Sequence, residues 1–194
     1  MESIAFKEWA IVCEALGRGV QSIILRKGGI AEGHEGFSFR HRDFFLFPTF
    51  FHEHIEKTRL SGVTIPGRRE GEIELRFMAK LEIAKWITSS EIAESLEPLH
   101  ILKPEVVHER FRYDGDSGLH VAFVRIFRLQ PAWIVGDEKS FAGCRSWVDL
   151  PGPEAGLSFQ PVLSESAHER KKKQFLDCTK EVAALPRELQ ARGS

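Results

Sequence analysis

The residues best suited to chemistry lie in one stretch, residues 26–54, where cations, glycines, carboxylates and imidazoles are concentrated. It opens with Arg26 and Lys27, followed directly by Gly28 and Gly29. Paired glycines let backbone N–H groups turn toward an anion, and two adjacent cations add charge attraction. The pattern lacks the Gly-Lys-Ser/Thr ending of a P-loop. The first interpretation is therefore a tight turn at the solvated end of a strand, and a simpler anion site is the alternative.

Metal-capable side chains follow in the same stretch: His41 and Asp43, then His52 and His54. If residues 50–58 are helical, positions 52 and 54 point about 200° apart and cannot share one ion. Only one of the two would then face inward, and a single partly buried histidine that makes structural hydrogen bonds is the first interpretation. We assign no metal ligands, no catalytic residue and no cofactor.

The candidate ligand-binding residues share this stretch and carry charge, a hydroxyl, an imidazole or a free backbone N–H. They are Arg26, Lys27, Gly28, Gly29, Glu35, His41, Asp43, Thr49 and His52.

The overall composition is that of a soluble globular protein, with 42% hydrophobic and 28% charged residues. A net charge of −1 gives no general attraction for a nucleic-acid backbone, so any such contact needs a local patch. Three scattered cysteines predict neither a zinc site nor a disulfide framework. We see no apolar run of about 18 residues and no signal peptide, and we expect a cytoplasmic protein that does not contact a membrane.

The elements that must position these residues are predicted as one α+β domain, with a mixed, mainly antiparallel sheet, short flanking helices and a C-terminal helix. Residues 72–83 alternate apolar and charged side chains, which predicts a long strand with one solvated face. Residues 119–129 are nearly all apolar and predict a central strand. Residues 44–47 predict a short buried strand, and residues 144–150 a last short one.

The remaining segments predict turns and helices. Residues 9–16 and 20–25 predict a β-hairpin, with a helix over residues 5–16 as the alternative. Phe37 and Phe39 alternate with polar neighbours as on a half-buried strand, and Thr49 could cap a helix reaching residue 57 or 58. Further helices are predicted in three places. They lie after Ser90, from Pro104 to Arg112, and over residues 165–185. Residues 130–143 and 151–161 are predicted to be irregular, and we place the boundary between the main domain (1–164) and the C-terminal helix and tail (165–194).

Several short blocks occur in an order that resembles an uncharacterised bacterial family, number 1802 among the domains of unknown function. The blocks are Lys7-Glu8-Trp9, Glu14-Ala15-Leu16, Leu25-Arg26-Lys27-Gly28-Gly29-Ile30, Phe45-Leu46-Phe47-Pro48-Thr49 with His52, Arg125 with Leu129, and Gly143-Cys144-Arg145-Ser146-Trp147-Val148. The resemblance covers roughly residues 5–150. Some relatives are joined to a restriction-endonuclease-like domain, so the resemblance implies work on nucleic acid or in restriction and modification. His52 matches the family pattern, so the resemblance favours it over His54 as the inward-facing histidine. Glu53 stands where many relatives have Gln, so the resemblance implies no role for that amide.

Three hypotheses about function follow. The first is a non-catalytic module that binds nucleic acid or a nucleotide at residues 26–49 and His52. The second is a metal-dependent phosphodiesterase or nuclease that uses Asp43 and His52. The third is a partner subunit without chemistry, which uses the Phe-rich segment as a protein interface.

Overall fold

The computed structural model describes residues 3–27, 37–50, 53–60, 67, 69–113, 117–143, 145–152 and 156–180. Its strands are β1 (Ile4–Trp9), β2 (Ile23–Arg26), β3 (Asp43–Thr49), β4 (Glu72–Ile87), β5 (Leu119–Gly136), β6 (Trp147–Asp149) and β7 (Ser158–Pro161). Its α-helices are α1 (Ala10–Gly17), α2 (Glu53–Glu56), α3 (Ser90–Ser95), α4 (Pro104–Arg112) and α5 (Glu165–Cys178). Short 3-10 turns span Glu97–Leu99 and Lys139–Phe141.

The strands form one sheet in the order β2-β5-β4-β3-β1-β6, with β7 added to the β2 side of β5. Strands β1 and β3 run parallel, whereas all the other pairs in the described sheet are antiparallel. The predicted α+β domain with a mixed, mainly antiparallel sheet and a C-terminal helix is confirmed.

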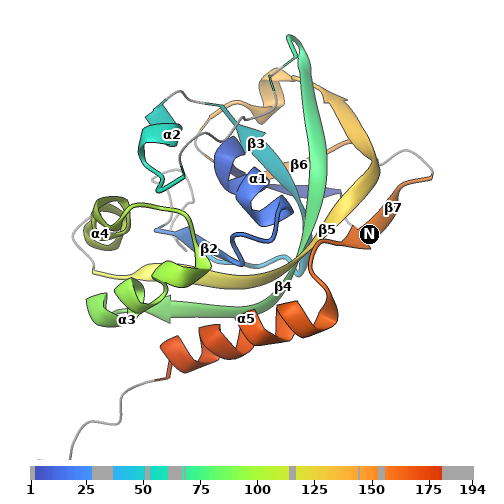
Figure 1. Ribbon diagram of the computed structural model, residues 1–194. Helices are drawn as coiled ribbons and strands as arrows, with labels where there is room; N and C mark the ends of the chain where they lie inside the picture. The colour runs from blue at the N-terminus through green and yellow to red at the C-terminus, as the bar shows by residue number, and fades with distance from the viewer. Residues whose placement is uncertain are drawn as a thin grey trace, which may run out of the picture.

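The long strands β4 and β5 curve through the whole molecule and separate helix α5 from helix α1 (Figure 1). Helix α5 runs along one side of these strands, α1 lies inside the curve, and α3 and α4 sit at the end where β4 gives way to β5. The main core contains Phe6 of β1, Phe44 of β3 and Trp147 of β6, whose rings pack edge to face or tilted at 5.0–5.8 Å. A second core lies around Phe45, Phe47 and the C-terminal half of β5.

Regular patterns in the sequence predicted several elements well. The alternating segment is β4, although it runs on to Ile87, and the apolar segment starting at Leu119 is β5. Helix α4 has the predicted bounds because Pro104 suits the first turn, where no N–H is needed. The predicted cap at Ser90 is one residue late, because Ser90 is the first residue of α3 and the side chain of Ser89 accepts from the N–H of Ile92.

The predicted hairpin over residues 9–16 and 20–25 is wrong, because residues 10–17 form helix α1 and β1 precedes it. Every residue of α1 is buried, so the segment shows no polar face from which a helical period could be read. The helix ends before Gly19, whose φ of 68° suits glycine, and the N–H of Gly19 bonds to the carbonyl of Leu16.

Two predictions around the Phe-rich stretch are also wrong. Phe37 and Phe39 lie outside any strand, and their rings pack against Phe6 instead of joining the sheet. Thr49 is the last residue of β3, and its hydroxyl donates to the carbonyl of Glu8 at 3.1 Å instead of capping a helix.

The irregular segment predicted over residues 130–143 is wrong in its first half, because strand β5 continues through Pro131 to Gly136. The pairing of β4 with β5 shifts between Leu75 and Phe77, opposite this proline, so its missing N–H costs little there. Pro161 likewise ends a short strand, β7, in the segment predicted to be irregular. Helix α5 ends at Cys178 with Thr179 as its C-cap, earlier than the predicted end at residue 185.

Candidate functional site

The ends of β1, β2 and β3 lie close together and bring several charged side chains to one place. Because β1 and β3 are parallel, both end at the same edge of the sheet, where Trp9 pairs with Thr49. The end of β2 is held there by side chains from two other elements, α4 and the segment before β6.

Arg26, the last residue of β2, is held by Ser146. The Nε and Nη2 atoms of its guanidinium donate to the Ser146 hydroxyl at 3.2 and 2.8 Å, and the group lies 5.6 Å from the centre of the Phe6 ring. Ser146 is buried, so its side chain is held in place and its hydroxyl oxygen fixes the position of the guanidinium. The structure therefore positions the cation that the sequence analysis singled out.

Arg110 of α4 reaches the same place from the opposite direction. It lies three and four residues after Val107 and Val106, on the inward face of the helix, and is therefore half-buried. Its Nη1 donates to the carbonyl of Leu25 at 2.7 Å, and its guanidinium lies 4.5 Å from the centre of the Trp9 ring.

A second cation lies near the indole of Trp9. The amine of Lys57, just after α2, is 5.9 Å from the centre of the Trp9 ring. Cations over an indole face are attracted by its quadrupole. We call the set Glu8, Trp9, Arg26, Lys57 and Arg110 the Arg26–Arg110 site.

Glu8 is the carboxylate of this site and is only 1% exposed. It accepts a hydrogen bond from the N–H of Trp9 at 2.8 Å. Burial lowers the pKa of the Arg110 guanidinium, the nearby Glu8 opposes that shift, and Arg26 adds to it. Two guanidinium groups are thus held within electrostatic reach of each other. Glu8, together with the exposed neighbour Glu109, is the negative charge that acts on Arg110.

The other predicted site residues are distributed as follows. Lys27 follows Arg26, donates to the carbonyl of Gly118 at 3.3 Å and lies 5.2 Å from the centre of the Trp86 ring. The ring of His41 lies 4.8 Å from that of Trp147, which packs on Phe6, so His41 and Arg26 contact the same aromatic cluster.

Asp43 and Thr49 stand at opposite ends of β3, about 20 Å apart at the rise of an extended strand. Arg26 ends β2 and Thr49 ends β3, two strands that do not pair with each other in the sheet, and Asp43 lies far from Thr49. Gly28, Gly29, Glu35 and His52 lie outside the described residues.

No group of three or more His, Cys, Asp or Glu side chains within the described residues could hold a metal ion. The acid-x-Lys arrangement of a metal-dependent nuclease needs its lysine on a strand. Lys139, in the Asp137-Glu138-Lys139 segment, instead begins a 3-10 turn after the end of β5.

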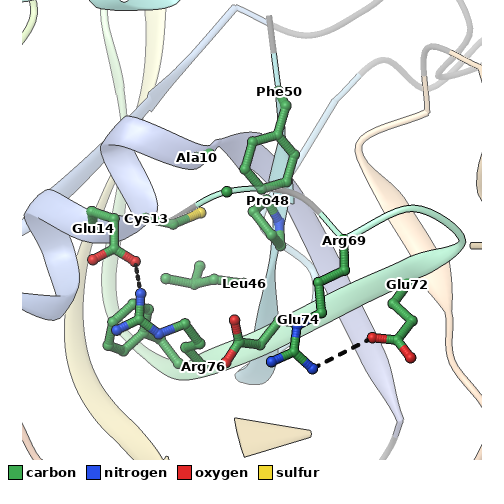
Figure 2. Close-up of a pocket in the computed structure, with 12 residues that line it drawn as sticks. Ala10, Cys13, Glu14, Leu46, Pro48, Phe50, Arg69, Glu72, Glu74 and Arg76 are labelled. Atoms are coloured by element: carbon green, nitrogen blue, oxygen red, sulfur yellow. Dashed lines mark hydrogen bonds and ion pairs between the residues drawn. The ribbon is translucent and has the colours of Figure 1, made fainter. Parts of the chain in front are cut away.

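A pocket beside α1 offers little room for a ligand (Figure 2). The Glu14 carboxylate binds Arg76 at 2.6 Å on one side, and Arg69 lies 3.7 Å from Glu72 on the other. The pocket volume is about 30 Å³, the share of one water molecule in the liquid. Burial raises the pKa of the Cys13 thiol, and Glu8 and Glu14 raise it further, so this thiol stays protonated and unreactive.

A wider depression of about 500 Å³ lies on the neighbouring side of β3. It is lined by Lys7, Phe47, Pro48, Thr49, Phe50, Ile73, Asp137, Glu138, Lys139, Phe141, Ala142 and Gly143. The buried Lys7 amine donates to the carbonyl of Gly143 at 3.0 Å. Thr49 lines this depression and also bonds to Glu8, so it stands between the depression and the Arg26–Arg110 site.

The sequence analysis assigned no site role to Glu8, Trp9, Lys57 or Arg110. Glu8 and Trp9 belong to a motif block, which was a usable signal. Arg110 could have been found as an arginine on the apolar face of the predicted helix, where a charge requires a reason.

The chain belongs to the family described as "Domain of unknown function (DUF1802)", whose model matches residues 5–174. The match extends past the region of resemblance predicted from the motif blocks. No curated protein matches the chain. Among solved structures, the fold is similar to the crystal structure of ASCH from Zymomonas mobilis, with a TM-score of 0.45 and 10% identity over 89% of this chain and 94% of that chain. A serine-to-alanine mutant of that protein matches with a TM-score of 0.44 and 10% identity over 89% and 95%. No helix in the described part of the chain is long and apolar enough to cross a membrane.

Proposed function

We propose that this chain is a non-catalytic module that binds nucleic acid or a nucleotide through the Arg26–Arg110 site. The observation that carries the proposal is the approach of two guanidinium groups, Arg26 and Arg110, each held by protein hydrogen bonds. Burial is the main cause of the lowered pKa of Arg110, and repulsion by the charge of Arg26 adds to the shift while Glu8 opposes it. A phosphate bound near both groups would relieve this repulsion and form charge-assisted hydrogen bonds with them.

The aromatic content of the site favours a nucleotide over a simple inorganic anion. Trp9, the last residue of β1, is only partly buried and lies near Arg110 of α4 and Lys57, which follows α2. Nucleotide sites commonly combine cations for the phosphate with an aromatic ring for the base. Binding of this kind would suit a component of a restriction or defence system in the cytoplasm, the setting that the family resemblance implies.

Titration of labelled DNA, RNA and mononucleotides at low salt, followed by fluorescence anisotropy, tests the proposal. Arg26→Gln and Arg110→Gln each remove a charge but keep a hydrogen-bond donor. We expect each to weaken binding by roughly tenfold, because a hydrogen bond to a charged group contributes about 1.5–3 kcal/mol. Arg170→Gln, on the exposed side of α5, is the matched control and should bind like the wild type.

Wild-type protein that binds none of these ligands at low salt would rule out the proposal. Equal losses in Arg170→Gln and Arg26→Gln would also contradict it, since the charge would then act without regard to position.

A further inference from the structure

One row of side chains crosses three neighbouring strands beside the Arg26–Arg110 site. Arg26 of β2 pairs with His120 of β5, and His120 pairs in turn with Trp86 of β4. Side chains of directly paired residues point to the same face of a sheet. A guanidinium, an imidazole and an indole therefore stand side by side across the sheet.

The indole at the end of this row is presented to solvent. Trp86 is 44% exposed although it contacts several neighbours. Its ring centre lies 4.5 Å from that of His120 and 5.2 Å from the Lys27 amine. Gly118 makes room beneath it, because a Cβ at that position would come within 2.3 Å of the indole. The indole is therefore supported by its neighbours and also accessible to a ligand.

The charge of the row limits what that contact can be. Arg26 stands at one end and Lys27 beside the other, so both ends carry a cation. Aromatic side chains between cations are typical of surfaces that bind single-stranded nucleic acid, where bases stack on rings and phosphates follow the charges. Arg26 and Trp86 stand two strands apart, so about 10 Å separate their backbones. A ligand that contacts both side chains must therefore be larger than one nucleoside.

We infer that the ligand is a single-stranded nucleic acid, which places a phosphate at the Arg26–Arg110 site and stacks a following base on Trp86. This inference rests on the proposed function and adds to it the polymeric, unpaired nature of the ligand. A duplex does not fit this arrangement, because its bases are stacked on each other and are not available to the indole.

The test compares Trp86→Ala, Trp86→Phe and wild type for binding to three probes. The probes are a mononucleotide, single-stranded oligonucleotides of about 4 to 16 nucleotides, which is the usual range of site sizes, and a duplex of the same sequence. We expect Trp86→Ala to weaken oligonucleotide binding by roughly 5- to 100-fold, the effect of losing one stacked base. Mononucleotide binding should stay unchanged, and Trp86→Phe should restore most of the oligonucleotide affinity.

Leu176→Ala provides a matched control, because Leu176 is 40% exposed on α5 and lies outside the row. Quenching of tryptophan fluorescence by the oligonucleotide should be smaller in Trp86→Phe than in wild type.

The outcomes separate this inference from the proposed function. If oligonucleotide affinity is unchanged in Trp86→Ala but reduced in Arg26→Gln, the inference that a base stacks on Trp86 is wrong. The proposed phosphate binding at the Arg26–Arg110 site would still hold. Duplex binding as tight as single-strand binding would also overturn the inference. A wild type that binds no probe would overturn both, and the Trp86 row would then suit a protein partner.

Discussion

At the scale of single residues, His100 shows how burial sets a charge state. It is 5% exposed, and its Nδ1 accepts a hydrogen bond from the N–H of Leu102 at 3.1 Å. Burial lowers its pKa to about 4, and the charges of Arg59 and Arg110 lower it further. The imidazole is therefore neutral in the folded protein near pH 7, as the accepting Nδ1 requires.

The low pKa of His100 predicts a pH-dependent stability. The folded pKa lies below the unfolded value of about 6.5, so the unfolded chain binds the extra proton and stability falls as pH drops from 6.5 toward 4. The full effect is about 3 kcal/mol for a shift of this size. Urea unfolding of wild type and His100→Asn across this range measures it. The stability advantage of the wild type should shrink toward pH 4, and an advantage independent of pH would contradict the prediction.

Gly17 makes a second prediction at the residue scale. A Cβ built there would lie 2.0 Å from the tip of the buried Phe77 ring, which is held between the guanidinium groups of Arg76 and Arg128. We expect Gly17→Ala to destabilise the protein by about 1–3 kcal/mol through overpacking, which outweighs the gain of about 1 kcal/mol in helix propensity. In the control Gly136→Ala, the new methyl group meets nothing within 4 Å. Thermal unfolding should show a lower Tm for Gly17→Ala alone.

At the scale of elements, helix α5 is attached to the sheet by both apolar and polar contacts, among them the ion pair of Glu165 with Arg125 of β5. Phe175 is fully buried against Phe123 of β5, with ring centres 5.4 Å apart. The buried His168 bonds to Glu82 at 3.0 Å, and Lys172 lies 2.9 Å from the same carboxylate. The pKa of Glu82 is lowered by these two partners against the opposing effect of burial.

The packing of α5 predicts unequal costs for its two neighbouring apolar residues. Phe175→Ala should cost about 3–5 kcal/mol, as for other buried aromatic residues. Leu176→Ala, one residue further and 40% exposed, should change stability by less than about 0.5 kcal/mol. Equilibrium denaturation of both variants provides the comparison. Equal losses of stability in the two variants would contradict the prediction, because burial of Phe175 would then not be what attaches α5 to the sheet.

At the scale of the whole molecule, the cations of the Arg26–Arg110 site lie together in a protein that is nearly neutral. The net charge of −1 gives no long-range attraction for a polyanion. Binding through Arg26, Lys57 and Arg110 should release only the counterions of the phosphates that these three residues meet. We expect a plot of log affinity against log salt to have a slope of about −2 for a single strand, at about −0.7 per phosphate. In Arg110→Gln the slope should be shallower by about 0.7. A much steeper slope in the wild type would indicate a larger basic surface than this site.

The sequence by itself determined the elements whose pattern is local. The alternation of Ile73, Leu75 and Phe77 with charged neighbours predicts strand β4. The opening proline and the apolar stripe of residues 104–112 predict helix α4. The fold class follows from such patterns because burial of one face imposes a period of two or of 3.6 residues. Arg26 was also identifiable, since its charge and the glycines after it stand next to each other in the chain.

Only the tertiary structure decided that residues 10–17 are helical and that Arg110 meets Arg26. Helix α1 is buried on all sides, so its neighbours in the fold, and not its own pattern, select its conformation. Arg110 and Leu25 are 85 residues apart, and their hydrogen bond depends on where α4 docks after the long β4–β5 pairing has formed. Contacts between distant segments depend on strand order and helix docking, which residue spacing along the chain does not encode locally.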